Sequence, residues 1–201
     1  MSTEPVSPEV FEPLVFWVEH KQKILTYATI VVIAIGGYGI YEFSTEQKAA
    51  ESQALFASAD SVTDFQNVLK KYPGTRVGGN AALELADKLR QDKKYDEAVA
   101  TLKEFIAKYP QHPLLAGAWA SLASTYEMQG KLDEAFDAYQ TTASKFPDAF
   151  TTPIAMMAQA RISAQKGKKD DARKMYQDVA ARYQESVFGR EAMREQRLLK
   201  K

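Results

Sequence analysis

Residues 113–147 read PLLAGAWASLASTYEMQGKLDEAFDAYQTTASKFP and contain two helical patterns separated by Gly130. The first pattern has large apolar residues at helical spacing, namely Leu115, Trp119, Leu122 and Tyr126. Glycine favours the left-handed conformation in which many helices end, so Gly130 marks the end of the first helix. The second helix is expected over 132–145, because Pro147 cannot continue the hydrogen bonds of a helix. The stretch therefore predicts a pair of antiparallel helices.

This pattern recurs at a step of 37 residues. Lys-Tyr-Pro at 71–73 returns at 108–110 and, as Lys-Phe-Pro, at 145–147. Two further series share this phase, namely Ala49, Ala86, Ala123, Ala160 and Phe65, Leu102, Tyr139, Tyr176. A period of about 20 to 50 residues is typical of solenoids, in which one helix pair is too small to bury its own apolar face. We therefore predict an all-α solenoid of antiparallel helix pairs with a 37-residue period.

A different apolar pattern precedes the repeats. Residues 24–41 read ILTYATIVVIAIGGYGIY, which is 18 residues without a charge, and Phe43 extends the segment past Glu42. About 20 helical residues span roughly 30 Å, the thickness of the hydrocarbon core of a bilayer. Trp17 and Tyr41 stand near the two ends, where aromatic residues are enriched in membrane helices. We predict one transmembrane helix over 24–43.

Two other interpretations of the apolar segment fit its residues less well. A cleaved signal peptide begins with a short basic region and ends at small residues, whereas this segment follows acidic-leaning residues and ends in Tyr-Glu-Phe. A helix in a protein core has polar positions every few residues, and residues 24–41 have no charged position. The membrane anchor explains the pattern better than either alternative.

The charges beside the anchor indicate its orientation. Lys21 and Lys23 precede it, while only Lys48 follows within about 20 residues, and Lys and Arg are enriched on the cytoplasmic side. The sequence therefore predicts a cytoplasmic tail over 1–23 and a single-pass protein with a periplasmic C-terminal domain in the bacterial inner membrane.

The remaining boundaries follow from the 37-residue phase. Residues 44–75 are expected to form juxtamembrane helices that make a degenerate first repeat. Residues 76–186 are expected to contain the tetratricopeptide-like repeats, and residues 187–201 a C-terminal capping helix. The three repeats are predicted over 76–110, 113–147 and 150–184.

The unit at 113–147 resembles the tetratricopeptide repeat family. The pattern of that family is W-x-x-L-G-x-x-Y, followed at set offsets by an alanine, an aromatic residue and a proline. The matching residues here are Trp119, Leu122, Ala123, Tyr126, Gly130, Ala135, Tyr139 and Pro147. In such a repeat the large side chains pack between helices. Trp119, Leu122, Tyr126, Tyr139 and Tyr176 are therefore expected to form the structural core. The resemblance implies a scaffold that binds other proteins.

Several kinds of chemistry are not indicated by the sequence. The absence of cysteine excludes disulfides and thiolate metal sites, and His20 and His112 have no metal-binding partner at helical spacing. The pair Asp133-Glu134 lies in the predicted first turn of a helix, where carboxylates complement the helix dipole and cap free N–H groups. A formal net charge of zero argues against nucleic-acid binding. We predict no enzyme activity, no cofactor and no small-molecule substrate.

The first helices of the repeats are expected to present a binding groove. The groove positions are predicted to be Asn80, Leu83, Asp87, Arg90, Met128, Ile154, Met157 and Arg161. Among them, Leu83, Met128, Ile154 and Met157 form an apolar strip, and methionine-rich surfaces adapt to varied partners. We expect the strip to bind extended or helical apolar segments of other proteins. Coverage of the strip by a neighbouring helix of the same chain is an open alternative.

The whole layout, a short tail, one anchor and a small repeat domain, resembles the YfgM-type family of ancillary subunits of the SecYEG translocon. This resemblance implies a chaperone-like adaptor that assists secreted or envelope proteins. It implies translocon subunits, periplasmic chaperones or client polypeptides as partners, and lipid contact through the anchor. A structural accessory subunit of a larger membrane protein complex is the alternative function.

Overall fold

The computed structural model describes residues 13–199, and every regular element in this range is a helix. The prediction of an all-α chain is therefore confirmed. The chain divides into two compact units, residues 1–51 and 52–201, which are described separately below. The first part of the predicted tail, residues 1–12, and the last two residues of the predicted capping helix lie outside the described range.

Helix α1 (Pro13–Ala57) contains the whole predicted span and extends past both of its ends. Its apolar side chains are exposed, with exposed fractions of 56% for Ile30, 67% for Ile35 and 73% for Ile40. No part of its most apolar stretch is buried, which argues against a core helix. Within residues 13–199, α1 is the one helix that is long and apolar enough to cross a membrane.

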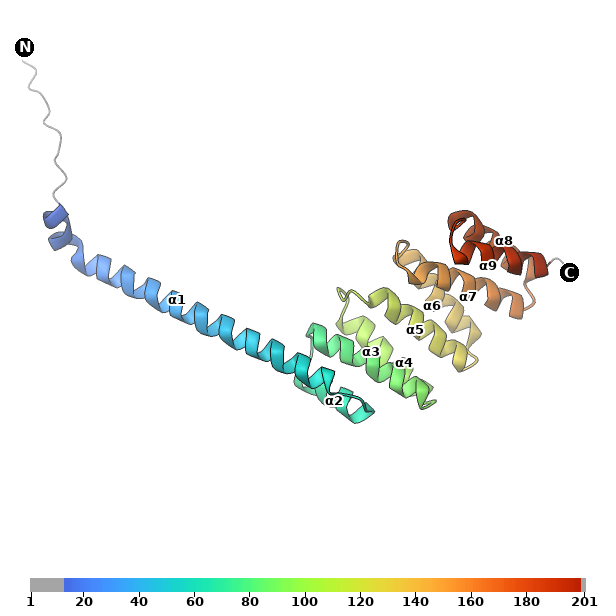
Figure 1. Ribbon diagram of the computed structural model, residues 1–201, viewed down its shortest axis with the longest axis horizontal. Helices are drawn as coiled ribbons and strands as arrows, with labels where there is room; N and C mark the ends of the chain where they lie inside the picture. Colours follow the sequence, from blue (N-terminus) through green and yellow to red (C-terminus); the bar gives the residue numbers. More distant parts are fainter. Residues whose placement is uncertain (1–12, 200–201) are drawn as a thin grey trace, which may run out of the picture. The chain divides into compact units, whose positions relative to one another are not determined.

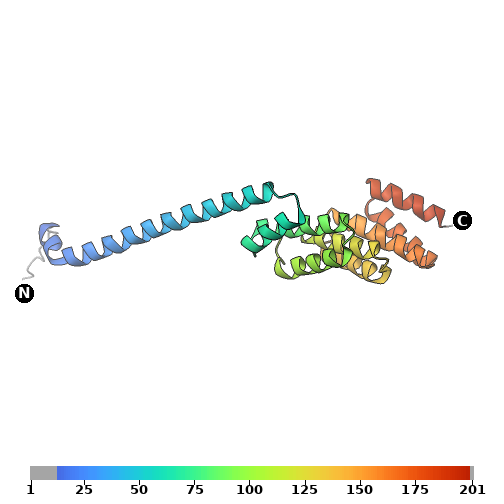
Figure 2. The same ribbon diagram turned by 90° about the horizontal axis from the view of Figure 1, so that it is seen from below.

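Eight shorter helices follow in the described chain (Figure 1). Their bounds are α2 (Val62–Lys71), α3 (Arg76–Gln91), α4 (Tyr95–Lys108), α5 (Leu115–Met128), α6 (Leu132–Lys145), α7 (Thr151–Gln165), α8 (Lys169–Arg182) and α9 (Val187–Leu198). From α2 onward each helix packs against the next, and α7 also contacts both α5 and α9. Figure 2 shows this succession from a second direction. The helices α3, α5, α7 and α9 are the first helices of successive pairs, and α4, α6 and α8 are the second helices.

The turns from first to second helices repeat the same geometry. Gly130 and Gly167 have φ values of 75° and 78°, in the left-handed region that glycine adopts without a steric penalty. Lys93 stands at the equivalent position of the first turn and has a φ of 60°. In all three turns the next residue donates its N–H to a carbonyl five residues earlier, as in Lys94 N to Leu89 O at 2.8 Å. The 37-residue step therefore corresponds to a repeated helix stop.

Small residues allow the helices to approach each other closely. Ala123 and Ala160 are fully buried, and Ala86 is 2% exposed. Among the residues predicted to form the core, the buried ones are Leu122, Tyr139 and Tyr176. Trp119 and Tyr126 are only half-buried, and each packs against two of the core clusters. These two aromatic residues therefore join neighbouring repeats at the edge of the core.

Helices α3 and α9 begin with the same kind of N-terminal cap, at positions three periods of 37 residues apart. Thr75 and Ser186 accept hydrogen bonds from the N–H groups of Gly78 and Gly189, at 3.0 and 3.2 Å. A Cβ atom at Gly78 would lie 2.3 Å from the carbonyl oxygen of Tyr72, which stands three residues before the cap Thr75. At Gly189 the corresponding distance is 2.1 Å. Both glycines are therefore required by a close backbone approach.

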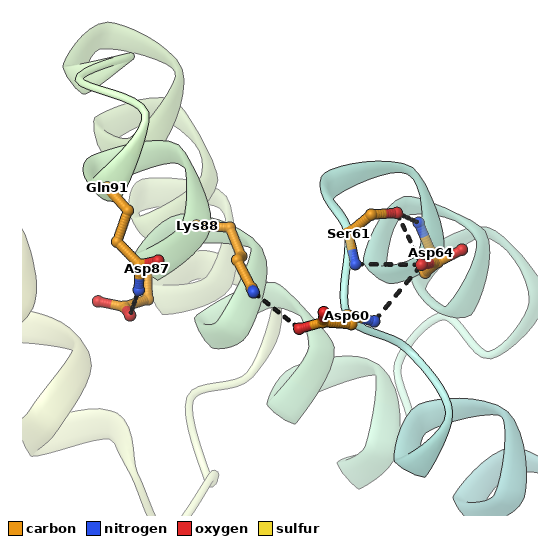
Figure 3. Close-up of polar contacts among 6 residues, drawn as sticks. All are labelled: Asp60, Ser61, Asp64, Asp87, Lys88 and Gln91. Carbon is orange, nitrogen blue, oxygen red and sulfur yellow. Dashed lines mark hydrogen bonds and ion pairs between the residues drawn. The ribbon is translucent and has the colours of Figure 1, made fainter.

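An ion pair joins the beginning of the repeat domain to α3 (Figure 3). Lys88 Nζ donates to Asp60 Oδ1 at 2.8 Å, and this hydrogen bond raises the pKa of Lys88. The neighbouring Asp64 accepts hydrogen bonds from the backbone N–H and the hydroxyl of Ser61, at 3.1 and 2.7 Å, which lowers the pKa of Asp64. These contacts fix the N-terminus of α2 beside α3.

Later carboxylates connect successive repeats in a similar way. Asp96 Oδ1 accepts from Gln129 Nε2 at 2.8 Å, and Asp133 pairs with Lys166. Each of these contacts joins one second helix to the C-terminal end of the next first helix. The expected caps are absent here, because neither α4 nor α6 has a side-chain hydrogen bond at its N-cap. The carboxylates bond across repeats instead of capping their own helices.

Candidate protein-binding surface

The first helices α3, α5, α7 and α9 together form one surface of the repeat domain, which we call the first-helix face. Two hollows open between its helices. The α3–α5 hollow has a volume of about 80 Å³ and is lined by Leu83, Ala86, Asp87, Arg90, Leu102, Gly117 and Ser121. The α7–α9 hollow has a volume of about 400 Å³ and is lined by Tyr139, Ile154, Met157, Ala158, Arg161, Tyr176, Phe188, Glu191 and Glu195.

Most of the groove residues expected from the sequence line one of these hollows. Those in the α3–α5 hollow are Leu83, Asp87 and Arg90, and those in the α7–α9 hollow are Ile154, Met157 and Arg161. Asn80 and Met128 line neither hollow. Asn80 is half-buried, and Met128 is exposed at the end of α5. The expected residues are therefore divided into two groups, with Leu83 apart from Ile154 and Met157.

A partly buried polar network connects α5, α6 and α7 beside the α7–α9 hollow. Glu127, whose side chain is 17% exposed, accepts hydrogen bonds from both terminal nitrogens of Arg161, one of them at 3.1 Å. The hydroxyl of Tyr139 donates to Glu127 Oε2 at 3.2 Å. Burial, assisted by the charge of Glu127, raises the pKa of Tyr139 to about 12. The hydrogen bond to Glu127 raises the pKa of Arg161, so the guanidinium is held in its charged form.

The other end of the first-helix face is polar and internally bonded. Asp87 accepts from Arg90 Nη2 at 2.8 Å and from Gln91 Nε2 at 2.7 Å, all within α3. Figure 3 shows the bond between Gln91 and Asp87 beside the pair of Lys88 and Asp60. The carboxylate of Asp87 is therefore already occupied. Two of these side chains, Asp87 and Arg90, line the α3–α5 hollow.

Sequence reasoning missed the contribution of α9 to this surface. Phe188, Glu191 and Glu195 form one wall of the α7–α9 hollow, although α9 was expected only as a capping helix. A signal was present, because Glu191 stands three periods of 37 residues after Asn80, a groove position. The exposed Phe150 was also missed; its ring meets that of Phe188 edge-on, with centroids 6.2 Å apart.

The two histidines have local structural contacts. The ring of His112 packs edge-on against Phe105 and Tyr109, with ring centroids 5.1 and 6.2 Å away. Its Nδ1 accepts from the N–H of Leu114 at 3.2 Å, and its Nε2 lies 3.4 Å from the carbonyl oxygen of Arg76. His112 thus connects two junctions between repeats. Within residues 13–199, no group of three His, Asp or Glu side chains is placed to hold a metal ion.

Comparison with known proteins gives the family. The model of the family described as Tetratricopeptide repeat-like domain matches residues 15–198, a range that includes most of α1 and all of α2 to α9. No curated protein sequence matches the chain.

Solved structures share the fold. The TPR-like repeats of a Podosopora anserina chain assigned as a kinesin light chain align with a TM-score of 0.58 at 16% identity, covering 78% of this chain and 81% of that one. A tetratricopeptide repeat protein from Parabacteroides merdae aligns with a TM-score of 0.60 at 15% identity, covering 77% and 59%. BtubC from P. vanneervenii aligns with a TM-score of 0.55 at 18% identity, covering 74% and 65%. Identities this low show a common fold and carry no information about partners.

Proposed function

Because this chain belongs to the tetratricopeptide repeat-like domain family, we propose that it is a membrane-anchored scaffold that binds other proteins through its first-helix face. The observation that carries the proposal is the α7–α9 hollow of about 400 Å³, which has apolar and charged walls and is larger than the hollow of about 80 Å³ between α3 and α5 on the same face. Solenoids of stacked helix pairs provide extended surfaces that typically bind proteins.

The anchoring part of the proposal is supported by α1. Its apolar side chains are exposed along most of the helix, and an exposed apolar surface of this extent is unfavourable in water. Trp17 and Tyr27 toward one end of the apolar segment and Tyr41 at the other suit the two interfaces of a bilayer. A lipid environment would cover this surface without requiring any further protein contact.

The orientation follows from the charges beside the apolar segment, and the partners follow from the resemblance of the whole layout. Lys21 and Lys23 precede the apolar segment, and this bias favours a cytoplasmic N-terminus and a periplasmic repeat domain in a bacterial inner membrane. The resemblance to ancillary translocon subunits favours a chaperone-like adaptor. Its partners would then be translocon subunits, periplasmic chaperones or client polypeptides. No enzyme activity is part of this proposal.

The proposal is tested by purifying the full-length chain from membranes in a mild detergent and identifying the co-purified proteins by mass spectrometry. We expect translocon subunits and periplasmic folding factors, and we expect Met157→Glu to reduce their recovery. Gln140→Glu serves as the matched control, because Gln140 is exposed on α6, outside the first-helix face. A constant, stoichiometric set of unrelated membrane proteins, unaffected by Met157→Glu, would instead indicate a structural accessory subunit.

A further inference from the structure

The two hollows of the first-helix face differ in what they can accept. The α3–α5 hollow, at about 80 Å³, leaves little room for a side chain, whereas the α7–α9 hollow, at about 400 Å³, falls in the range of about 300 to 1,000 Å³ that is typical of binding pockets. The larger hollow is lined on its apolar side by Ile154, Met157 and Phe188. A large apolar side chain such as leucine or phenylalanine fits this volume and this lining.

Apolar surface continues outside the hollow. Phe150 is 77% exposed and touches Phe188 edge-on, and Val187 at the start of α9 is 61% exposed. Aromatic residues that are exposed beside a pocket are typical of sites where a partner covers them. An occupant of the hollow would therefore also contact Phe150.

The opposite wall of the hollow carries an excess of negative charge. Glu191 and Glu195 of α9 share a single guanidinium, that of Arg194, whose Nη2 lies 3.4 and 2.9 Å from their oxygens. The guanidinium that lines this hollow, that of Arg161, is bonded to Glu127. Three carboxylates thus face two guanidinium groups in this part of the described chain.

Both carboxylates of α9 act on the interior of the hollow. Burial and then the charges of Glu195 and Glu191 raise the pKa of Tyr176, while the charge of Arg161 lowers it. A basic group of a partner placed here would gain attraction from two carboxylates at a partly desolvated site. An anionic occupant, such as the carboxylate of a fatty acid, would be repelled.

We propose that the α7–α9 hollow binds a segment of a partner protein that inserts one large apolar side chain and places a lysine or arginine, one helical turn away, against Glu191 and Glu195. The inference rests on the proposed function as a protein-binding scaffold and adds the chemistry of the bound segment. Charge complementarity selects the basic residue, and the lining of Ile154, Met157 and Phe188 selects the apolar one.

The test uses the full-length chain in lipid nanodiscs and fluorescein-labelled helical peptides of 14 residues. One peptide carries Leu with Arg three positions later, a second replaces the Arg with Glu, and a third replaces the Leu with Ser. Fluorescence anisotropy is expected to show binding of the first peptide at least about tenfold tighter than that of either other peptide. The double variant Glu191→Gln with Glu195→Gln is expected to remove the preference for Arg over Glu. Phe150→Ala is expected to weaken binding of the first peptide.

The matched control is Glu134→Gln with Asp137→Asn, because these two exposed carboxylates lie on α6. This double variant should keep the preference for the basic peptide. Equal affinity for all three peptides, or loss of the preference only in the control, overturns the inference. If the peptides bind and their affinities do not change in the variants at Glu191, Glu195 and Phe150, the inference is wrong but the scaffold function is not contradicted. If no peptide binds and the nanodisc sample contains dimers that Phe150→Ala dissociates, the occupant is a second copy and the inference is also wrong.

Discussion

Helix α1 and the repeat helices are both rich in apolar residues, but they place those residues in opposite surroundings. Ile33 in α1 is 68% exposed, whereas Ile162 in α7 is fully buried. Helices such as α2, α3 and α9 have charged residues at helical spacing, and so have one face for their neighbours and one for water. Helices α5 and α7 carry one charge each, Glu127 and Arg161, and contain small and polar residues among their apolar ones. Residues 24–41 have no charged position and no such division. The difference shows that the arrangement of apolar residues, more than their number, decides whether a segment joins a core or a membrane.

The largest expected effect comes from opening the repeat core. Phe105 is 1% exposed and packs against the rings of Tyr109 and His112. Phe105→Ala should lower the free energy of unfolding by about 3 to 5 kcal/mol, because the lost contacts leave a cavity. Urea unfolding followed by circular dichroism measures this loss. Membrane retention should not change, and a loss below about 1 kcal/mol would contradict the packing described for Phe105.

The converse experiment places a charge in α1. Ile33→Arg should disfavour membrane insertion by about 3 kcal/mol, since a cation near the bilayer centre is poorly solvated. The fraction of protein that stays in the membrane pellet after carbonate extraction should fall, while unfolding of the repeats stays the same. Ile33→Leu is the control and should remain in the pellet. Unchanged retention of the Ile33→Arg chain would show that residues 24–43 do not anchor it.

The start of α9 provides a smaller test within the repeats. Gly189→Ala would place a Cβ atom only 2.1 Å from the carbonyl oxygen of Tyr183. The junction must shift, at a loss of about 1 to 3 kcal/mol of stability. Gly117→Ala, on α5, has no atom within 4 Å of the added Cβ and should be neutral or stabilising. Equal midpoints of thermal unfolding for the two variants would contradict the close approach at Gly189.

The turn between α3 and α4 offers a stabilising substitution. Lys93 adopts a φ of 60°, where a side chain is disfavoured, while the equivalent residues of the next two repeats are glycines. Lys93→Gly should raise the free energy of unfolding by about 1 kcal/mol, and Gly130→Lys should lower it by a similar amount. Chemical unfolding of the two variants measures both changes. If Lys93→Gly lowered the stability, the side chain of Lys93 would have to make a contact that contributes more free energy than the backbone strain costs.

The smallest effect concerns pH. The hydrogen bond and charge of Lys166 lower the pKa of Asp133 below its ordinary value, so folding favours the ionised carboxylate. This contribution is present above the pKa of the unfolded chain, about 3.9, and is lost as the pH falls through the lower folded value. Asp133→Asn should therefore be less stable than the unchanged chain at pH 7 and equal to it at about pH 2. A stability difference that persists at that pH would contradict this assignment.

The sequence predicted the fold well wherever the 37-residue phase was visible. Gly130 gave a helix end, and the aromatic positions Tyr139 and Tyr176 gave buried positions, that the structure contains. The stop at Lys93 carries no glycine and could not be recognised from residue type. Its conformation is imposed by the same hydrogen bonds that close the other two turns.

The candidate surface was harder to predict. Periodicity placed Ile154, Met157 and Arg161 on the same helix face, and these residues do line one hollow. The contribution of Phe188 and Glu191 depends on how α9 packs against α7, which local pattern does not determine. The bond between Asp87 and Arg90, two residues that line the α3–α5 hollow, was likewise not visible in the local pattern.

The claim that the first-helix face binds proteins is tested most directly by site-specific photo-crosslinking in cell membranes. A photoreactive phenylalanine analogue is placed at Met157 in the α7–α9 hollow or at Gln140 on the exposed side of α6. We expect discrete protein adducts from position 157 and none of the same adducts from position 140. Identical adducts from both positions, or none from position 157, would contradict binding at this face.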